Sequence, residues 1–312
     1  MAKLPQTLIV LALLGATAAA FAVTERLKLE RSPITGTRVD RLFSPVCECA
    51  HDAATISFVL RQRGELTVDV LDPDGEVVRT LVRDRDEPRG RVTYTWDGRD
   101  ESGRIVAEAR YRPRVRIEEH GRTIVLPNSI RVDTTPPVVR FTDAFPRVFS
   151  PDGDGNSDRV TATYEVDEIA RAMLLVDGRR RVLGRFRPRG GRLTWFGQVN
   201  GRPVRPGVYE LRLRAFDRAG NRSRRTRAIA VRVRYVELRR DRIEVVAGRR
   251  FGVRVDTDAD SYRWLFAGER GVGREELLVL RAPETAGTYT VYVAVGRFAD
   301  RAEVVVTEPE GA

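Results

Sequence analysis

From Leu42 onward the sequence alternates apolar and polar residues with a period of two almost without interruption. The run from Val92 to Trp96 and the run from Tyr289 to Val295 each place their apolar side chains on one face of an extended strand. Turn-forming sequences such as Asp72-Pro73-Asp74-Gly75 separate these runs. No stretch after residue 40 sustains a helical period. We therefore predict an all-β chain of tandem antiparallel sandwiches that follows an N-terminal apolar helix.

Two parts of the chain repeat one another. The triplet Phe-Ser-Pro at 43–45 recurs at 149–151, and residues 90–96 parallel residues 191–195. The two copies meet at 134–137, where two consecutive prolines hold the backbone extended and predict a semi-rigid hinge. A third unit lacks the opening triplet. Each unit has one tryptophan in an alternating run, and we expect each tryptophan to lie in a core; they are Trp96, Trp195 and Trp264.

The repeat, the proline hinge and the change in composition near the N-terminus divide the chain into six predicted segments. Residues 1–23 form a signal anchor or signal peptide, and residues 24–41, which are polar and lack periodicity, form a stalk. The sandwiches occupy 42–134, 135–234 and 235–308, and residues 309–312 are a tail.

The N-terminal segment has two interpretations. After Lys3 an apolar stretch runs from Leu8 to Val23, and small residues at 18–22 fit a signal-peptidase site. The same stretch reaches the lower length limit of a membrane-spanning helix. We favour a retained anchor, with extracytoplasmic domains on a single-pass protein of the cell membrane; secretion after cleavage is the alternative. The basic residues that follow the stretch oppose export, but the modules beyond them are typical of exported proteins.

All but two of the 55 basic residues are arginine, and the formal net charge is +11. The arginines alternate with apolar residues, so we expect them on solvent-exposed strand faces, interleaved with Asp and Glu and forming no block. The simplest interpretation is a solvated charged surface. Binding of an acidic envelope polymer or of lipid headgroups is the alternative. We predict no nucleic-acid partner, because the chain lacks interleaved basic and aromatic residues of the kind that line a nucleic-acid groove.

One loop has the residue types of a calcium site. Asp152, Asp154, Asn156 and Asp158 offer oxygen ligands at alternating positions, and the glycines between them let the backbone curl. The alternative is a turn in which these side chains cap their own backbone. A bound calcium would be structural, and we expect it to stiffen the junction of the first two sandwiches.

The corresponding loop of the first copy carries the only two cysteines, Cys47 and Cys49. In an exported chain two thiols this close predict a local disulfide. A metal site that adds His51, intermolecular pairing and free thiols are the alternatives; the spacing is tighter than that of ordinary zinc ligands.

The first copy resembles the immunoglobulin-like domain of the flagellar hook-capping protein (FlgD type), which also occurs in secreted bacterial proteases and surface proteins. The residues that carry the resemblance are the strand 78–81, the turn Trp96-Asp97-Gly98, Gly103 and Tyr111. The second copy is a weaker match, because Phe196-Gly197 replaces Asp-Gly after its tryptophan. The third unit has only a general immunoglobulin-like or PKD-like pattern, and its Gly-x-Tyr at 287–289 resembles a tyrosine corner. The resemblance implies a fold and an exported structural role, and no activity.

Catalytic sequence motifs are absent, and two histidines leave little material for acid–base or metal chemistry. We therefore expect a non-catalytic, exported, membrane-anchored surface protein whose tandem modules act as a spacer or as a scaffold for protein–protein interaction. The alternative is a binder of acidic cell-wall polymer or polysaccharide through arginine-rich strand faces. An enzyme would have to use carboxylates alone, and the sequence nominates no pair. We expect no required cofactor; the structural calcium is a candidate only. The partner is an unidentified envelope protein or polymer.

Overall fold

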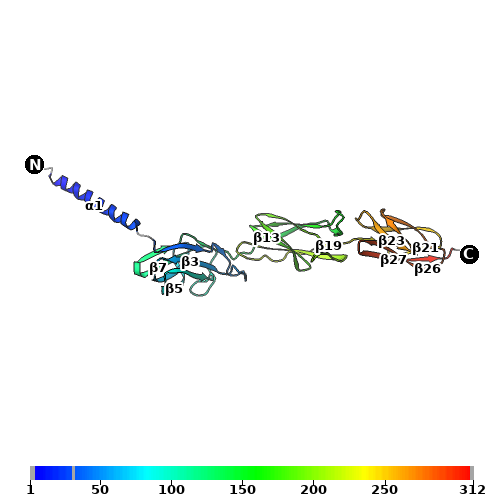
Figure 1. Ribbon diagram of the computed structural model, residues 1–312, viewed down its shortest axis with the longest axis horizontal. Coiled ribbons are helices and arrows are strands. Elements are labelled where there is room, and N and C mark those ends of the chain that lie inside the picture. Colours follow the sequence, from blue (N-terminus) through cyan, green and yellow to red (C-terminus); the bar gives the residue numbers. More distant parts are fainter. Residues whose placement is uncertain (1–3, 30–31, 310–312) are drawn as a thin grey trace. The chain divides into compact units, whose positions relative to one another are not determined.

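The computed structural model describes residues 4–29 and 32–309, which divide into two compact units, Met1–Thr134 and Thr135–Ala312. The first unit begins with α1 (Leu4–Leu29), drawn in blue in Figure 1. Within the described ranges, no helix combines the length and the apolar character that crossing a membrane requires. Every other regular element is a strand, except for one turn of 3-10 helix at Glu118–His120.

The first unit is a sandwich of two sheets. One sheet has the order β1-β3-β6 and the other has the order β2-β9-β7-β4-β5, with β8 paired to β7. The strands are β1 (Ile34–Val39), β2 (Leu42–Phe43), β3 (Ala54–Leu60), β4 (Gly64–Leu71), β5 (Val77–Glu87), β6 (Gly90–Trp96), β7 (Arg110–Ile117), β8 (Arg122–Val125) and β9 (Ile130–Val132).

The predicted stalk at 24–41 is wrong for its C-terminal part. Residues 34–39 form β1, which pairs antiparallel with β3, and Ile34 is only 5% exposed in the core. The register shifts between Thr35 and Arg38, so β1 has no regular alternation. That irregularity is why a period-two criterion overlooks the strand.

The second unit contains two sandwiches, and its N-terminal sandwich is the second of the chain. Its sheets have the orders β10-β12-β15 and β11-β19-β18-β13-β14, and β16 and β17 form a separate two-stranded antiparallel sheet. The strands are β10 (Val139–Phe145), β11 (Val148–Phe149), β12 (Val160–Val166), β13 (Ala170–Val176), β14 (Arg179–Arg187), β15 (Gly190–Trp195), β16 (Gln198–Val199), β17 (Arg202–Pro203), β18 (Gly207–Phe216) and β19 (Ile229–Val233).

The third sandwich is built in the same way, from sheets of order β20-β22-β25 and β21-β27-β26-β23-β24. It appears in yellow to red in Figure 1. The strands are β20 (Glu237–Leu238), β21 (Arg242–Val246), β22 (Arg250–Asp256), β23 (Tyr262–Phe266), β24 (Glu269–Gly273), β25 (Leu277–Arg281), β26 (Gly287–Val295) and β27 (Phe298–Thr307). The fold is thus all-β with tandem sandwiches, as predicted.

Each sandwich has its own hydrophobic core. Trp96 packs edge-on against Phe43 and Tyr111, with ring centroids 5.6 and 5.0 Å apart. Trp195 is buried in the equivalent place in the second sandwich. Trp264 is only partly buried: it packs against the core of the third sandwich and lies over Gly271, so the predicted tryptophan core is confirmed there only in part. The aromatic centre there is Phe266, which is buried and contacts Phe251.

The sequence repeat corresponds to the same packing contacts in the first two sandwiches. In the first two sandwiches the Phe-Ser-Pro triplet lies against the glycine that follows the tryptophan; a Cβ at Gly98 would lie 3.0 Å from Phe43. A Cβ at Gly197 would lie 2.5 Å from Pro151. All three sandwiches also have a tyrosine corner. The hydroxyls of Tyr111, Tyr209 and Tyr289 donate to the carbonyl oxygens of Ala107, Arg205 and Thr285 at 2.8, 2.8 and 3.0 Å.

Candidate functional site

The predicted calcium loop lies between β11 and β12 in the second sandwich. Carboxylate oxygens of Asp152, Asp154 and Asp158 lie within 4.8 Å of one another. The fourth predicted ligand, Asn156, directs its side-chain nitrogen to the carbonyl oxygen of Asp258 at 3.4 Å. The structure therefore brings together three of the four predicted residues. Carboxylates are ligands that suit calcium, and calcium binding here stays a prediction.

The same carboxylates cap the backbone of their own loop. The two oxygens of Asp158 accept the N–H groups of Gly153 and Gly155 at 2.7 and 2.8 Å. Asp154 accepts the N–H of Asn156 at 2.7 Å. These bonds are the self-capping turn that the sequence offered as the alternative to a metal site. They hold the loop in place through protein contacts.

The loop lies at a different junction from the one we expected. β10 separates it from the Pro136-Pro137 hinge and has seven residues, a length of ~23 Å at ~3.3 Å per residue. The loop instead approaches the third sandwich, since Asn156 bonds to Asp258. An ion bound here would act on the junction between the second and third sandwiches, and the expectation that it stiffens the first junction is wrong.

Asp258 is an acidic residue of this loop region that sequence reasoning missed. Burial, with a smaller contribution from the carboxylates of Asp152 and Asp154, raises the pKa of Asp258 to about 6. Burial likewise raises the pKa of Asp152. The signal was the acidic run Asp256-Thr257-Asp258-Ala259-Asp260, but only the tertiary fold places one of its carboxylates beside the loop.

The raised pKa of Asp258 predicts that the second unit becomes more stable on mild acidification. Ionisation of this carboxyl is less favourable in the folded chain than in the unfolded chain, so a destabilisation present at pH 7.5 disappears as the pH falls through about 6. Because the side chain is partly exposed, we expect Asp258→Asn to stabilise the unit by only about 1 kcal/mol at pH 7.5. Denaturant unfolding at pH 7.5 and 5 measures both effects.

The matched control for this prediction is Asp260→Asn, which removes an exposed acid two residues away. The control should keep the wild-type gain in stability between pH 7.5 and 5, and Asp258→Asn should lose most of it. Equal gains in the two variants would contradict the assignment to Asp258.

The cysteine loop of the first sandwich is closed by a disulfide between Cys47 and Cys49. Ser44 donates its backbone N–H to the carbonyl oxygen of His51 at 3.0 Å, which closes the base of the same loop. With both sulfur atoms in the disulfide, neither is a thiolate that could bind a metal together with His51. The loop thus has a covalent link where the second copy has carboxylate caps.

Removal of this disulfide should destabilise the first sandwich modestly. The bond closes a loop of three residues, and the entropy of so short a loop corresponds to about 1–2 kcal/mol. We expect the double variant Cys47→Ser/Cys49→Ser to lose this amount in denaturant unfolding. A reductant should produce the same loss in the wild type and none in the variant; a loss in the variant that the reductant enlarges would contradict the prediction.

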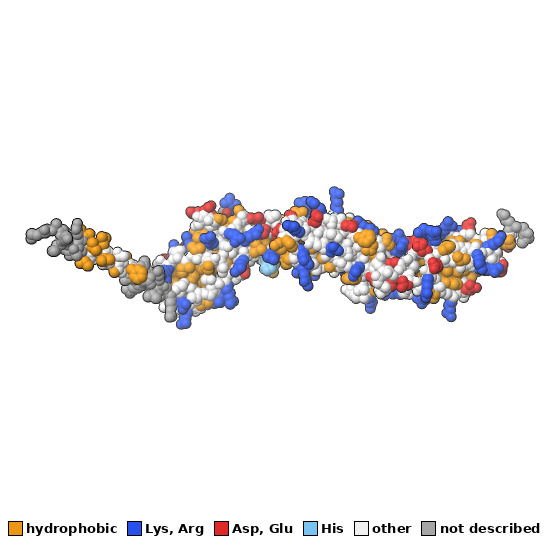
Figure 2. Space-filling view, turned by 90° about the horizontal axis from the view of Figure 1, so that it is seen from above, with side chains coloured by type: hydrophobic (Ala, Val, Ile, Leu, Met, Phe, Trp, Pro, Cys, Tyr) orange, Lys and Arg blue, Asp and Glu red, His pale blue; other side chains and the backbone are white. Residues whose placement is uncertain are grey.

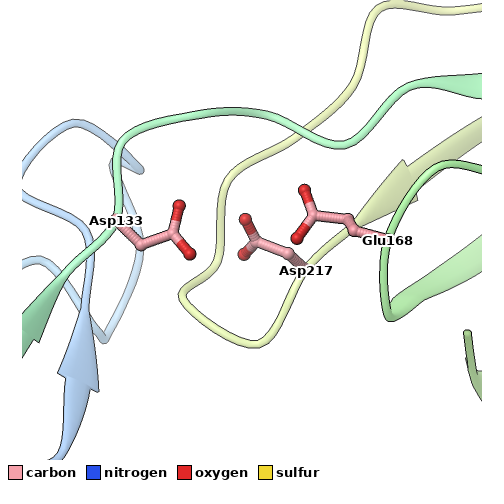
Figure 3. Close-up of side chains that lie close together, drawn as sticks. All are labelled: Asp133, Glu168 and Asp217. Carbon is pink, nitrogen blue, oxygen red and sulfur yellow. The ribbon is translucent and has the colours of Figure 1, made fainter. Parts of the chain in front are cut away.

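Another group of carboxylates in the second unit is the pair Glu168 and Asp217 (Figure 3). Oxygens of Glu168 and Asp217 are within 4.8 Å of one another. Asp217 is buried and accepts the backbone N–H and the side-chain Nδ2 of Asn221 at 2.9 and 2.8 Å. Asn221 is the asparagine of a glycosylation sequon, but its side chain is only 2% exposed. Its Nδ2 atom is hydrogen-bonded to Asp217 within the turn. Asp133, also labelled in Figure 3, belongs to the first unit, where it lies 3.3 Å from Arg131.

Arginines gather at one edge of the second sandwich, contrary to the expectation that they form no block. The residues of β14, β15 and the turn between them that make up this arginine edge are Arg179, Arg180, Arg181, Arg185, Arg187, Arg189 and Arg192. Among the described residues, none of the seven has a carboxylate within 4.0 Å. Elsewhere acidic side chains occur among the basic ones, as on the face in Figure 2.

The sequence holds a signal for this edge that alternation alone does not reveal. No acidic residue occurs between Asp177 and Glu210. β14 and β15 then lie at the same side of the sandwich, at the ends of different sheets. Arg185, Arg187 and Arg192 line one hollow of about 370 Å³ between them.

A larger hollow, of about 760 Å³, adjoins the arginine edge and shares Arg192 with it. Its lining includes Thr161 and Thr163 of β12 and two exposed aromatic rings, those of Phe145 and Phe196. The arrangement supplies positive charge, aromatic faces and hydroxyl groups. Guanidinium groups are donors that suit anionic ligands.

The fold defines this protein as a chain of tandem immunoglobulin-like sandwiches. More specifically, residues 50–120 match the family model of the FlgD Ig-like domain. That match lies within the first sandwich and agrees with the resemblance that the sequence showed there. No curated protein matches the chain.

Several solved structures of low sequence identity are similar to the chain. A three-domain immunoglobulin fragment of titin is 12% identical, covers 90% of this chain and 100% of its own, and has a TM-score of 0.33. A bacterial ice-binding adhesin is 12% identical, with coverages of 89% and 97% and a TM-score of 0.33. A C-terminal fragment of intimin, in complex with the intimin-binding domain of its translocated receptor, is 9% identical, with coverages of 66% and 66% and a TM-score of 0.34.

Proposed function

We propose that the protein is an exported, non-catalytic scaffold whose tandem sandwiches hold partners at the cell envelope. The proposal rests on the architecture of the described residues, which form separate sandwiches in tandem. Three sandwiches with separate cores account for nearly all its regular structure after α1. Such modules present surfaces on loops and strand faces without a shared catalytic cleft.

Two further observations support export. The disulfide Cys47–Cys49 is of the kind that persists outside the reducing cytosol. The apolar helix α1 precedes the sandwiches, as a signal or an anchor would. In the proposed arrangement α1 directs the chain out of the cytosol, and the sandwiches extend into the extracytoplasmic space.

Cross-linking in living cells tests the scaffold role. A photo-reactive residue at an exposed position such as Val208 or Val272 would be illuminated in intact cells that carry the chain. We expect discrete protein adducts that are lost when the site moves to the buried Val231. Adducts confined to cytosolic proteins, or none from any exposed position of the three sandwiches, would overturn the proposal. Cell fractionation of the same samples distinguishes a retained anchor from a cleaved signal.

A further inference from the structure

We propose that the second sandwich binds a polysaccharide whose sugars carry carboxylate groups. The ligand would lie in a track made of the two adjoining hollows beside β15, one lined by the arginine edge and the other by aromatic and hydroxyl side chains. This assignment goes beyond the scaffold role, which requires only protein partners.

The positive charge of the arginine edge favours an anionic ligand. Arg185, Arg187 and Arg192 line one hollow, so their like charges repel one another. The described residues supply no carboxylate within 4.0 Å of any of the seven arginines of the edge. The Nε atom of Arg181 is also buried with no hydrogen-bond partner among the described residues. Charged side chains on an edge strand do prevent strand pairing between molecules. That role, however, needs neither two hollows nor aromatic rings beside the charges.

Arg192 joins the two hollows into one track. It lies in β15 opposite Thr163 of β12, so both side chains belong to the same face of the three-stranded sheet. It also lines the smaller hollow with Arg185 and Arg187. A ligand in contact with Arg192 can therefore reach the arginine edge in one direction and the larger hollow in the other.

The larger hollow has the chemistry of a sugar site. Phe145 and Phe196 are 72% and 52% exposed, and such rings can pack against the C–H faces of sugars. The guanidinium carbon of Arg159 lies 6.0 Å from the centre of the Phe196 ring, which places a positive charge beside that aromatic surface. Thr161, opposite Phe145 in the sheet, provides a hydroxyl on the same face.

The acidic residues that border the track already have partners. Asp143 lies 3.0 Å from Arg147, and Glu165 lies 3.9 Å from Arg140. Asp158 accepts two backbone N–H groups of its own loop. Of these acids only Asp158 lines a hollow, against four lining arginines, so the net charge of the track is positive. Guanidinium groups bind carboxylates through paired N–H donors, which favours sugar acids over neutral sugars.

A polysaccharide fits this surface better than a membrane does. The charges and the rings line hollows along the side of a sandwich, where a chain of linked rings could lie. A lipid surface would instead require apolar side chains at a projecting tip with the basic residues around them. Binding to anionic vesicles is therefore an outcome that the test must separate.

The test measures binding of the full-length protein, in a neutral detergent, to polygalacturonate. The edge variant Arg185→Gln/Arg187→Gln/Arg192→Gln has a control of equal charge, Arg249→Gln/Arg250→Gln/Arg274→Gln, which removes three exposed arginines of the third sandwich. We expect the edge variant to bind about tenfold more weakly and the control to stay within about twofold of wild type. Circular dichroism would verify that each variant is folded.

Two further arms identify the chemistry. Phe196→Ala should weaken binding about fivefold at both low and high salt, because its loss is one of packing and not of charge. Methyl-esterified polygalacturonate, which has the same rings without the charge, should not bind measurably. Equal weakening by the two triple variants, equal binding of the ester, or binding to phosphatidylglycerol vesicles without binding to the polymer would each overturn the proposal.

Discussion

Replacement of Trp96 by alanine will lower the free energy of unfolding of the first sandwich by about 3–5 kcal/mol. The indole is fully buried and contacts Phe43 and Tyr111 at centroid distances of 5.6 and 5.0 Å. Its Nε1 donates to the carbonyl oxygen of Arg99 at 3.0 Å, so the substitution also removes the hydrogen bond that holds the following turn. A loss of this size approaches the whole stability of a small domain.

Hydrogen exchange resolved by segment measures this loss, because it reports each module separately. Residues 34–132 should lose protection while residues 139–307 keep theirs, since the two units are separate compact bodies. Trp264→Ala is the matched control: its indole is only partly buried, so we expect a smaller loss, confined to the third sandwich. Equal losses for Trp96→Ala and Trp264→Ala would contradict the account of the cores.

Replacement of Tyr235 by alanine will separate the unfolding of the second sandwich from that of the third. Tyr235 lies between β19 and β20 and is fully buried. Its ring stacks on Phe298 of the third sandwich with centroids 3.7 Å apart, and its hydroxyl donates to the carbonyl oxygen of Val204 at 2.7 Å. One side chain thus joins both sandwiches, and its truncation should cost about 3–5 kcal/mol.

Denaturant unfolding of Tyr235→Ala should show two transitions for the second unit where the wild type shows one. Tyr235→Phe keeps the stacked ring and loses only the hydroxyl, so we expect a loss of about 1 kcal/mol and a single transition. Tyr292→Ala, which truncates an exposed tyrosine, should change little. A single transition in Tyr235→Ala with less than 1 kcal/mol lost would refute the proposed coupling.

The alternation of apolar and polar residues predicted the fold, because in a sheet with one buried face every second side chain of a strand points into the core. The alternation at 92–96 and 289–295 and the repeated Phe-Ser-Pro triplet each became a strand or a packing contact. Residues 34–39 became a strand too, but a register shift hides their alternation. Trp264 alternates like the other two tryptophans and packs against the core of its sandwich, yet it lies over Gly271 and stays only partly buried.

The candidate sites were predicted only where their residues are close in sequence. The carboxylates of Asp152, Asp154 and Asp158 and the pair Cys47 and Cys49 lie within single loops, so spacing alone brought them together. Asp258 is about a hundred residues from that loop, and only tertiary packing makes it a neighbour. The hollows beside β15 likewise need the pairing of β12 with β15, which no local pattern specifies.

The state of the two cysteines in living cells tests the central claim, export to the envelope, most directly. Cells that carry the full chain would be quenched in acid, denatured and treated with a maleimide that adds mass to each free thiol. Since Cys47 and Cys49 are the only cysteines, the account predicts no mass added to the chain at first, and two additions after reduction. Two additions before any reductant would place the sandwiches in a reducing compartment and contradict the account.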